Sequence, residues 1–201
     1  RRVVKSAEQL DQGRLAASGR AHDTDRFACL HMEMDVVKNP ELPELPRFGL
    51  RLFLKKDMDQ LEYYGVGPQE SYIDKCKAGS HGIYMGSVTD QHEDYIRPQE
   101  NGSHADCDYV IVKGSGLGVA AYGAQSFAFN VSEYTQEELT EKAHNYEIVP
   151  CGSTVLCLDY KQNGIGSQSC GPRLKEKYRF DEERFTFEMN LNPLYGTMIE
   201  K

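Results

Sequence analysis

The sequence predicts an all-β protein built from antiparallel strands, and three observations lead to this prediction. Apolar and polar residues alternate with a period of two in several stretches, which is typical of strands buried on one face. One short stretch alone carries the signals of a helix. The segments between the alternating stretches are rich in glycine and proline. Many strands with a single short helix indicate a sandwich or a barrel.

Six stretches are predicted to be strands. They are residues 27–37, 48–54, 108–113, 127–131, 154–160 and 184–191. Four of them alternate regularly, so one face of each strand should be buried and the other should meet water. The stretches at 108–113 and 154–160 are instead apolar and rich in β-branched or aromatic residues, which favours deeper burial.

One helix is predicted, and Thr135 is expected to cap its N-terminus. Glu138, three residues on, is placed to bond back to the Thr135 backbone and complete a capping box. Leu139 and Ala143 give the helix a weak apolar face. At about two turns it is a connector rather than an architectural element.

Three stretches are predicted to lack strands. Residues 39–47 contain three prolines and indicate an extended crossover. Residues 65–107 are rich in Gly, Asp, His and Gln, and residues 161–175 are rich in Gly and Ser. Long loops on a rigid sandwich often carry binding residues, so these two stretches are candidates for function.

Composition and charge exclude some classes of partner. The net charge is −8, which does not attract phosphate backbones, so we expect no nucleic acid partner. No run of about 18 apolar residues exists, so no membrane span is expected. The six cysteines are irregularly spaced and form no CxxC pair, which predicts free thiols in a reducing compartment.

The chain is expected to be one domain cut from a longer protein. Its 201 residues suffice to bury a core without staples. It opens with Arg1 rather than Met, and no apolar segment of a signal peptide follows. Residues 1–26 show no clear period and are predicted to be a ragged edge of the sandwich or part of a preceding sheet. Residues 27–201 are predicted to form the sandwich.

Histidines and glutamates are candidates for chemistry in the 65–107 stretch. His81, His92 and His104 lie in the 65–107 stretch, but their spacing fits no compact metal motif, so ordinary loop histidines are favoured. Glu70 and Glu100 each follow a Pro-Gln pair. We interpret both as turn residues whose carboxylates bind loop backbone amides or an arginine.

Several segments together resemble the C-terminal "small chain" domain of β-galactosidases of glycoside hydrolase family 2. They are LPRFGL at 45–50, YGVGPQESYID at 64–74, RPQENG at 97–102, FNVSEYT at 129–135, His144, LDY at 158–160, GIGS at 164–167 and SCGP at 169–172. Their order and spacing agree with that family from about residue 28 to residue 190.

The resemblance implies a fold and a function. The fold would be an antiparallel supersandwich related to galactose-mutarotase-like domains and lacking its first strands. The parent would be a cytoplasmic, bacterial, homo-oligomeric retaining hydrolase of terminal β-D-galactosides such as lactose. Its catalytic glutamates, its magnesium and often a sodium ion belong to a TIM barrel, as a domain or a large subunit. The chain itself would then hold no cofactor and no catalytic residue and would be inactive alone.

One binding role is implied for this chain. In the family, the loop that matches residues 168–172 reaches the mouth of the barrel, where a tryptophan forms a platform for the sugar or its leaving group. Cys170 stands at that position here, and a thiol offers no ring face. We hypothesise that Cys170, with Ser169 and Gln168, lines the substrate cleft of the full enzyme, the alternative being a cysteine that only packs against the barrel.

Two other functions stay open from the residues. A stand-alone carbohydrate-binding module would hold galactosides by itself, at about millimolar affinity or tighter. A mutarotase-like enzyme would need a histidine and a carboxylate converging on the sugar, for which His81 or His104 with Glu70 or Glu100 are candidates.

Overall fold

A computed structural model describes the chain at residues 4–5, 29–166 and 172–196. Its elements, in chain order, are β1 (Val4–Lys5), β2 (Leu30–Val37), β3 (Arg47–Lys55), β4 (Gln60–Gly67), β5 (Ser80–Ser87), η2 (Thr89–Gln91), β6 (Ser103–Lys113), β7 (Leu117–Ser132), α1 (Gln136–Glu141), η3 (Asn145–Glu147), β8 (Ser153–Gln162), η4 (Glu176–Tyr178) and β9 (Arg184–Tyr195). Apart from the short parallel pair of β1 and β2, the strands pair antiparallel. The prediction of an all-β antiparallel sandwich is confirmed.

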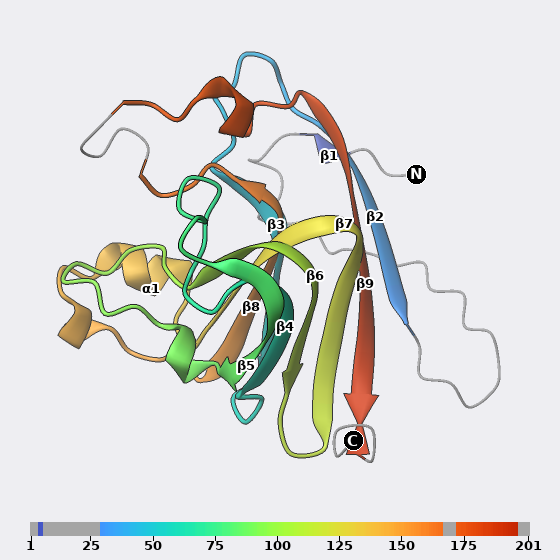
Figure 1. The fold of residues 1–201 in the computed structure, drawn as a ribbon, viewed down its shortest axis with the longest axis vertical. Helices are drawn as coiled ribbons and strands as arrows, with labels where there is room; N and C mark the ends of the chain where they lie inside the picture. Colours follow the sequence, from blue (N-terminus) through green and yellow to red (C-terminus); the bar gives the residue numbers. More distant parts are fainter. Residues whose placement is uncertain (1–3, 6–28, 167–171, 197–201) are drawn as a thin grey trace.

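The strand β7 joins the two parts of the sandwich (Figure 1). The strand order is β1-β2-β9-β7-β6-β4-β5, and β8 and β3 branch off from β7. Residues 117–122 of β7 pair with β9, whereas residues 128–132 pair with β8. One strand therefore belongs to both layers, which is how corners are made in packed sheets.

An irregular stretch in β6 and β7 makes this change of layer possible. The register between the two strands shifts on either side of Cys107, and Asp106 adopts a left-handed backbone with φ of 54°. Extra residues of this kind bend a strand and increase its twist. The hairpin of β6 and β7 consequently curves over the core, as Figure 1 shows.

The core is a continuous apolar cluster supplied by the inner faces of the strands. Its members include Leu61, Tyr63, Val110, Val112, Phe127, Phe129, Leu156, Leu158, Phe187 and Met189. Phe129 is fully buried, and its ring centroid lies 5.0 Å from that of Tyr63 and 5.1 Å from that of His104. The alternating pattern of the sequence therefore corresponds to the inside and outside of the sandwich.

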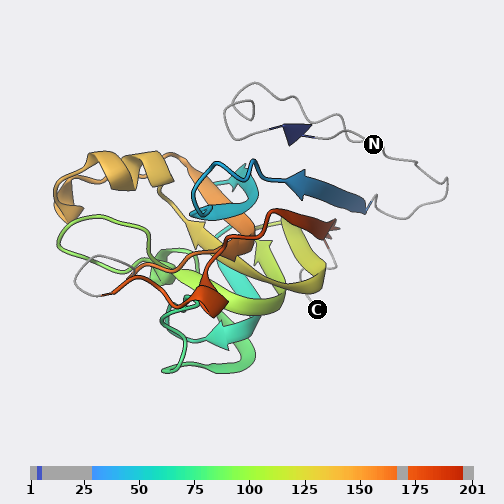
Figure 2. The ribbon, with the colours of Figure 1, turned by 90° about the horizontal axis from the view of Figure 1, so that it is seen from above.

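The helix α1 lies at the side of the molecule opposite to β2 and β9 (Figures 1 and 2). As predicted, Thr135 caps it, because its hydroxyl accepts the Glu138 N–H at 3.2 Å, and Leu139 is buried. The predicted return bond from Glu138 is wrong. The Glu138 carboxylate instead accepts the N–H of Val149 at 2.9 Å, which fastens the segment after the helix.

The prediction for residues 65–107 is partly wrong, because β5 lies within that stretch. This strand forms the edge of the sheet, and Tyr84 on its inner face packs against Tyr63. Ile83 and Met85 lie on the other face and are 61% and 76% exposed. Because its apolar residues are divided between the two faces, period-two analysis misses this strand. Residues 114–116 form the turn between β6 and β7, with Gly116 at φ of 92°.

Three remaining predictions concern the cysteines, a membrane span and the N-terminal boundary of the sandwich. The five cysteines of the described part are free, as predicted. Within the same residues, no helix is long and apolar enough to cross a membrane. The strand β1 pairs with β2 through Val4 and Lys5, but residues 6–28 lie outside the described chain. The proposed boundary at residue 26 therefore stays a prediction.

We expect Phe129→Ala to lower the free energy of unfolding by about 3–5 kcal/mol, since a fully buried ring leaves a cavity. Phe53→Ala is the matched control, because Phe53 is 58% exposed on β3, and it should cost less than about 1 kcal/mol. Urea unfolding followed by circular dichroism measures both. Equal losses would contradict the assignment of inner and outer faces.

Candidate functional site at the base of the 163–173 loop

The predicted substrate residues Gln168, Ser169 and Cys170 lie outside the described chain. The structure does describe the residues on both sides of them, up to Gly166 and from Pro172 onward. The candidate site is therefore built from these flanks and from the segments that hold them. We call Glu44, Asn163 and Arg173 the loop base, because they join the two ends of the 163–173 loop.

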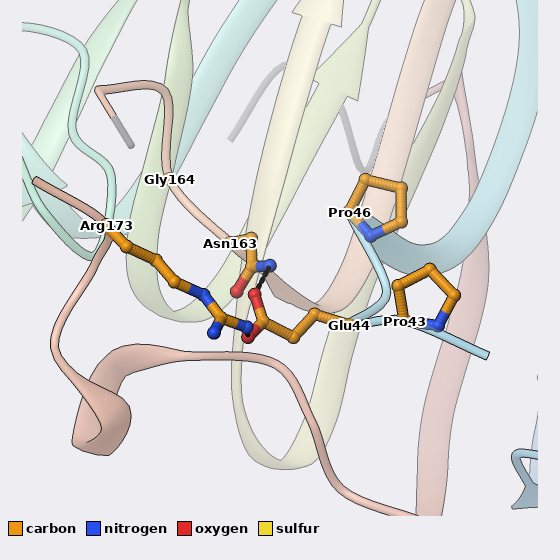
Figure 3. Close-up of a pocket in the computed structure, with 6 residues that line it drawn as sticks. All are labelled: Pro43, Glu44, Pro46, Asn163, Gly164 and Arg173. Atoms are coloured by element: carbon orange, nitrogen blue, oxygen red, sulfur yellow. Dashed lines mark hydrogen bonds and ion pairs between the residues drawn. The ribbon is translucent and has the colours of Figure 1, made fainter. Parts of the chain in front are cut away.

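Glu44 lies between the two ends of this loop (Figure 3). Its Oε2 accepts a hydrogen bond from Asn163 Nδ2 at 3.3 Å, and its Oε1 forms an ion pair with the Arg173 guanidinium. Arg179 Nε lies 3.8 Å from the same Oε1. The Glu44 side chain is only 18% exposed, and three nitrogen-bearing side chains, those of Asn163, Arg173 and Arg179, surround its carboxylate.

Asn163 connects three separate segments of the chain. Its backbone N–H donates to the carbonyl of Pro46 at 2.9 Å, and its side-chain Oδ1 accepts the N–H of Phe180 at 2.7 Å. Leu45 N–H donates in turn to the Phe180 carbonyl at 3.0 Å. The proline-rich crossover, the end of β8 and the segment before β9 are thereby fastened together.

A hollow of about 370 Å³ opens beside the loop base. It is lined by Pro43, Glu44, Pro46, Asn163, Gly164 and Arg173. In Figure 3 the two proline rings lie on one side, and the charged side chains meet across from them. A surface of this size, with apolar rings and a few polar groups, suits either a small polar ligand or the side chains of a neighbouring domain.

A second hollow, of about 330 Å³, shares part of its lining with the first. Its lining is Pro46, Arg47, Gln99, Glu100, Gln162, Gly164 and Ile165. Gly164 and Pro46 line both depressions. Both depressions flank the stretch that leads into the predicted substrate residues.

Arg47 neutralises two carboxylates beneath the second hollow. Its Nη1 donates to Glu100 Oε2 at 2.9 Å, its Nε donates to Asp159 Oδ1 at 3.2 Å, and its Nη2 bonds the other Asp159 oxygen. Asp159 is 3% exposed, and burial raises its pKa while Arg47 opposes that rise. Burial also raises the pKa of Glu100. Burial lowers the pKa of Arg47, but the two carboxylates outweigh this and raise it above its ordinary value.

The roles predicted for Glu70 and Glu100 are confirmed. Glu70 accepts the backbone N–H of Gly102 at 2.8 Å and binds Lys75 and the Tyr95 hydroxyl. Glu100 binds Arg47 and has one buried oxygen, Oε1, without a hydrogen-bond partner among the residues that the structure describes. Both carboxylates thus fasten loops, which is consistent with charges that are costly to bury unless they are paired.

The loop histidines do not gather into a site. His104 is 1% exposed, and burial lowers its pKa to about 4, so it is a neutral core residue. Its Nε2 bonds Gln91 Oε1 at 2.8 Å. His81 lies on β5, at the other edge of β4 from β6, and its Nε2 bonds the Asp106 carbonyl at 2.9 Å. Among the described residues no group of three His, Cys, Asp or Glu is placed to hold a metal ion. The buried His104 cannot meet a sugar, so its proposed mutarotase role is wrong.

The sequence also matches a described family over most of its length. The family described as "Beta galactosidase small chain" matches residues 22–191 of this chain. The chain belongs to this small-chain family.

Individual β-galactosidases are similar to the chain. The β-galactosidase of Actinobacillus pleuropneumoniae is 46% identical over 189 residues, which is 94% of this chain and 18% of that protein. That of Staphylococcus xylosus is 40% identical over 83% of this chain and 17% of the relative, and that of Kluyveromyces lactis is 31% identical over 81% and 16%. The chain thus spans less than a fifth of these β-galactosidases.

The loop base of this small-chain domain was missed by sequence analysis. Glu44, Asn163 and Arg173 come from three segments that carry no periodic signal, so nothing local indicates that they meet. The motifs that carry the family resemblance did include Arg47 and Asp159. Their order in the chain could have suggested a shared site, but their pairing required the register of β3 with β8.

We expect Arg47→Met to destabilise the small-chain domain by about 3 kcal/mol at pH 8, because it leaves the buried Asp159 charge unpaired. The loss should shrink toward pH 4. Burial raises the pKa of Asp159 and Glu100, so the folded state binds their protons more tightly than the unfolded state. Stability that depends on those protons is therefore present in acid and lost as the pH rises through the raised values.

The control for this prediction is Arg51→Met. Arg51 pairs with Glu137 on the surface, where both side chains are substantially exposed, so the change should cost less than about 1 kcal/mol. Urea unfolding of both variants and the wild type at pH 4 and pH 8 gives the comparison. A loss for Arg47→Met that is unchanged between the two pH values would contradict the role assigned to the carboxylates.

Proposed function

We propose that the chain is the C-terminal domain of a β-galactosidase, and that it completes the active site without performing the chemistry. The observation that carries the proposal is the family match over residues 22–191 in a chain that spans only 18% of its A. pleuropneumoniae relative. The rest of such an enzyme is long enough to hold a catalytic barrel.

The state of the carboxylates supports this division of labour. Hydrolysis of a glycoside needs two carboxyl groups about 5–9 Å apart that can reach the scissile bond. The carboxylates that line the two hollows, Glu44 and Glu100, are each ion-paired with an arginine. Each of these carboxylates already binds an arginine and fastens neighbouring segments, so the catalytic pair is expected in the barrel.

The fastened loop supports a contribution to binding. Glu44 ties both ends of the 163–173 loop to the proline-rich crossover. A loop with fixed ends presents its middle residues with little loss of conformational entropy. In this proposal the loop closes the galactoside cleft, and the hollows beside it receive residues of the barrel, as a domain or a separate large subunit.

We expect β-galactosidase activity to appear only when the chain meets a barrel. The test mixes the purified chain with the A. pleuropneumoniae enzyme lacking its matching segment, and follows hydrolysis of a chromogenic β-galactoside. Activity from the mixture, with neither part active alone, would agree with the proposal. Hydrolysis by the chain alone would contradict it. Two folded but inactive partners, together with galactoside binding by the chain at about millimolar affinity or tighter, would favour a stand-alone binding module.

The role of Cys170 stays a prediction with its own test. If Cys170 lines the cleft, Cys170→Trp in the full-length enzyme should change KM for β-galactosides, because an indole provides a flat face for a sugar or its leaving group. Cys151→Trp, at an exposed cysteine after α1, is the control and should leave KM unchanged. Unchanged KM for several galactosides in Cys170→Trp would count against the role.

A further inference from the structure

Asp74 reaches across from another loop to hold the chain where it leaves β8. Residues 164–166, here called the glycine limb, follow β8 and lead directly into residue 167. Asp74 Oδ2 accepts the N–H of Gly166 at 2.9 Å, and Asp74 Oδ1 accepts the N–H of Ile165 at 3.3 Å. One carboxylate therefore binds two successive backbone amides across 91 and 92 residues of sequence.

The shape of the glycine limb depends on this contact. Gly164 has φ of 74°, a conformation that residues with a side chain rarely adopt. A Cβ added to Gly164 would lie 2.3 Å from Asp74 Oδ1 and 2.5 Å from its carboxyl carbon. Glycine is thus required here both by the backbone and by the carboxylate that packs against it.

Asp74 is carried on a rigid support. The two residues at the tip, Ile73 and Asp74, are flanked by Tyr72 and Lys75, whose backbones exchange two hydrogen bonds of 2.9 Å. Tyr72 is 1% exposed, and Lys75 binds the buried Glu70 carboxylate. Both flanks of the tip are therefore fixed to the sandwich, so the position of the Asp74 carboxylate is set before the limb meets it.

We infer that Asp74 is a positioning residue that fixes the direction in which the chain enters the predicted substrate residues 168–170. The inference rests on the proposed function, and it unites two separate motifs of the sequence, the YID end at 72–74 and the GIG at 164–166. The Asp74 side chain is exposed, so its two hydrogen bonds contribute little to global stability. Its effect falls on substrate binding instead.

The experiment compares Asp74→Asn with Asp57→Asn in the full-length enzyme. Asparagine keeps the shape of the side chain but can accept only one of the two amides, and its NH₂ group opposes the other. Asp57 is an exposed carboxylate that accepts the Ser115 hydroxyl at the opposite end of the strands, and serves as the control. Asp74→Asn should speed hydrogen–deuterium exchange at Ile165 and Gly166, and raise KM for a β-galactoside roughly 10- to 100-fold.

Measuring kcat and KM separately distinguishes positioning from general damage. A loop that binds substrate and transition state alike affects KM and leaves kcat within about threefold. The melting temperature should match that of Asp57→Asn. A fall in melting temperature without a change in KM would show a purely structural role and would overturn the inference.

A glycine comparison tests the contact from the other side. Gly164→Ala and Gly152→Ala both place a side chain at positive φ, 74° and 83°, but the Cβ at Gly152 meets nothing within 4 Å. Only Gly164→Ala should raise KM. In an Asp74→Ala background, the added effect of Gly164→Ala on KM should fall below twofold, because the colliding carboxylate is gone.

Each outcome is decisive. Unchanged exchange at Ile165 and Gly166 in Asp74→Asn would overturn the inference whatever the activity. Faster exchange with unchanged KM would overturn it too, because the limb would then be held for reasons unrelated to substrate. If the wild-type enzyme hydrolyses no galactoside, the proposed function fails, and hydrogen exchange still decides whether Asp74 holds the limb.

Discussion

The arrangement of the domain depends on a single strand being shared between two layers. β7 gives its first residues to β9 and its last to β8, and its hairpin with β6 bends around Cys107 to allow this. If β7 were straight, β8 and β3 would extend the sheet instead of closing over it. Within the closed layer, the pairing of β3 with β8 sets Arg47 opposite Gln162, and the next residues, Pro46 and Asn163, meet at the loop base.

Several carboxylates of this acidic chain hold loops in place. Glu44, Glu70, Asp74 and Glu100 each bind cationic side chains or backbone amides contributed by another segment. A carboxylate accepts several hydrogen bonds from fixed directions, so it can set the geometry of an irregular segment that has no ladder of its own. These four carboxylates therefore organise loops that lie far apart in the sequence.

How far the sequence predicts this structure differs between the strands and the site. Alternation of apolar and polar residues predicts the strands with one buried face, such as β2, β3 and β9, and the capping residue Thr135 predicts the helix. The edge strand β5 does not alternate in this way, because its apolar residues are divided between the two faces: Ile83 and Met85 lie exposed, whereas Tyr84 packs against Tyr63. The functions of Glu70 and Glu100 followed from their turn motifs. The partners Glu44, Asn163 and Arg173 could not be found, since their contact is created only by the pairing of β3 with β8 and by the segment before β9.

The pairing of β2 with β9 has a consequence for biosynthesis. His31 and Asn190 bond across 159 residues of sequence, and Arg47 and Asp159 across 112. Contacts between such distant residues make folding slow, because a long loop must close before any of them is formed. During translation β2 and β3 leave the ribosome long before β8 and β9 exist. Their apolar faces stay unpaired until β8 and β9 are made. A chain that stops before residue 184 therefore lacks β9 itself and leaves β2 without its antiparallel partner.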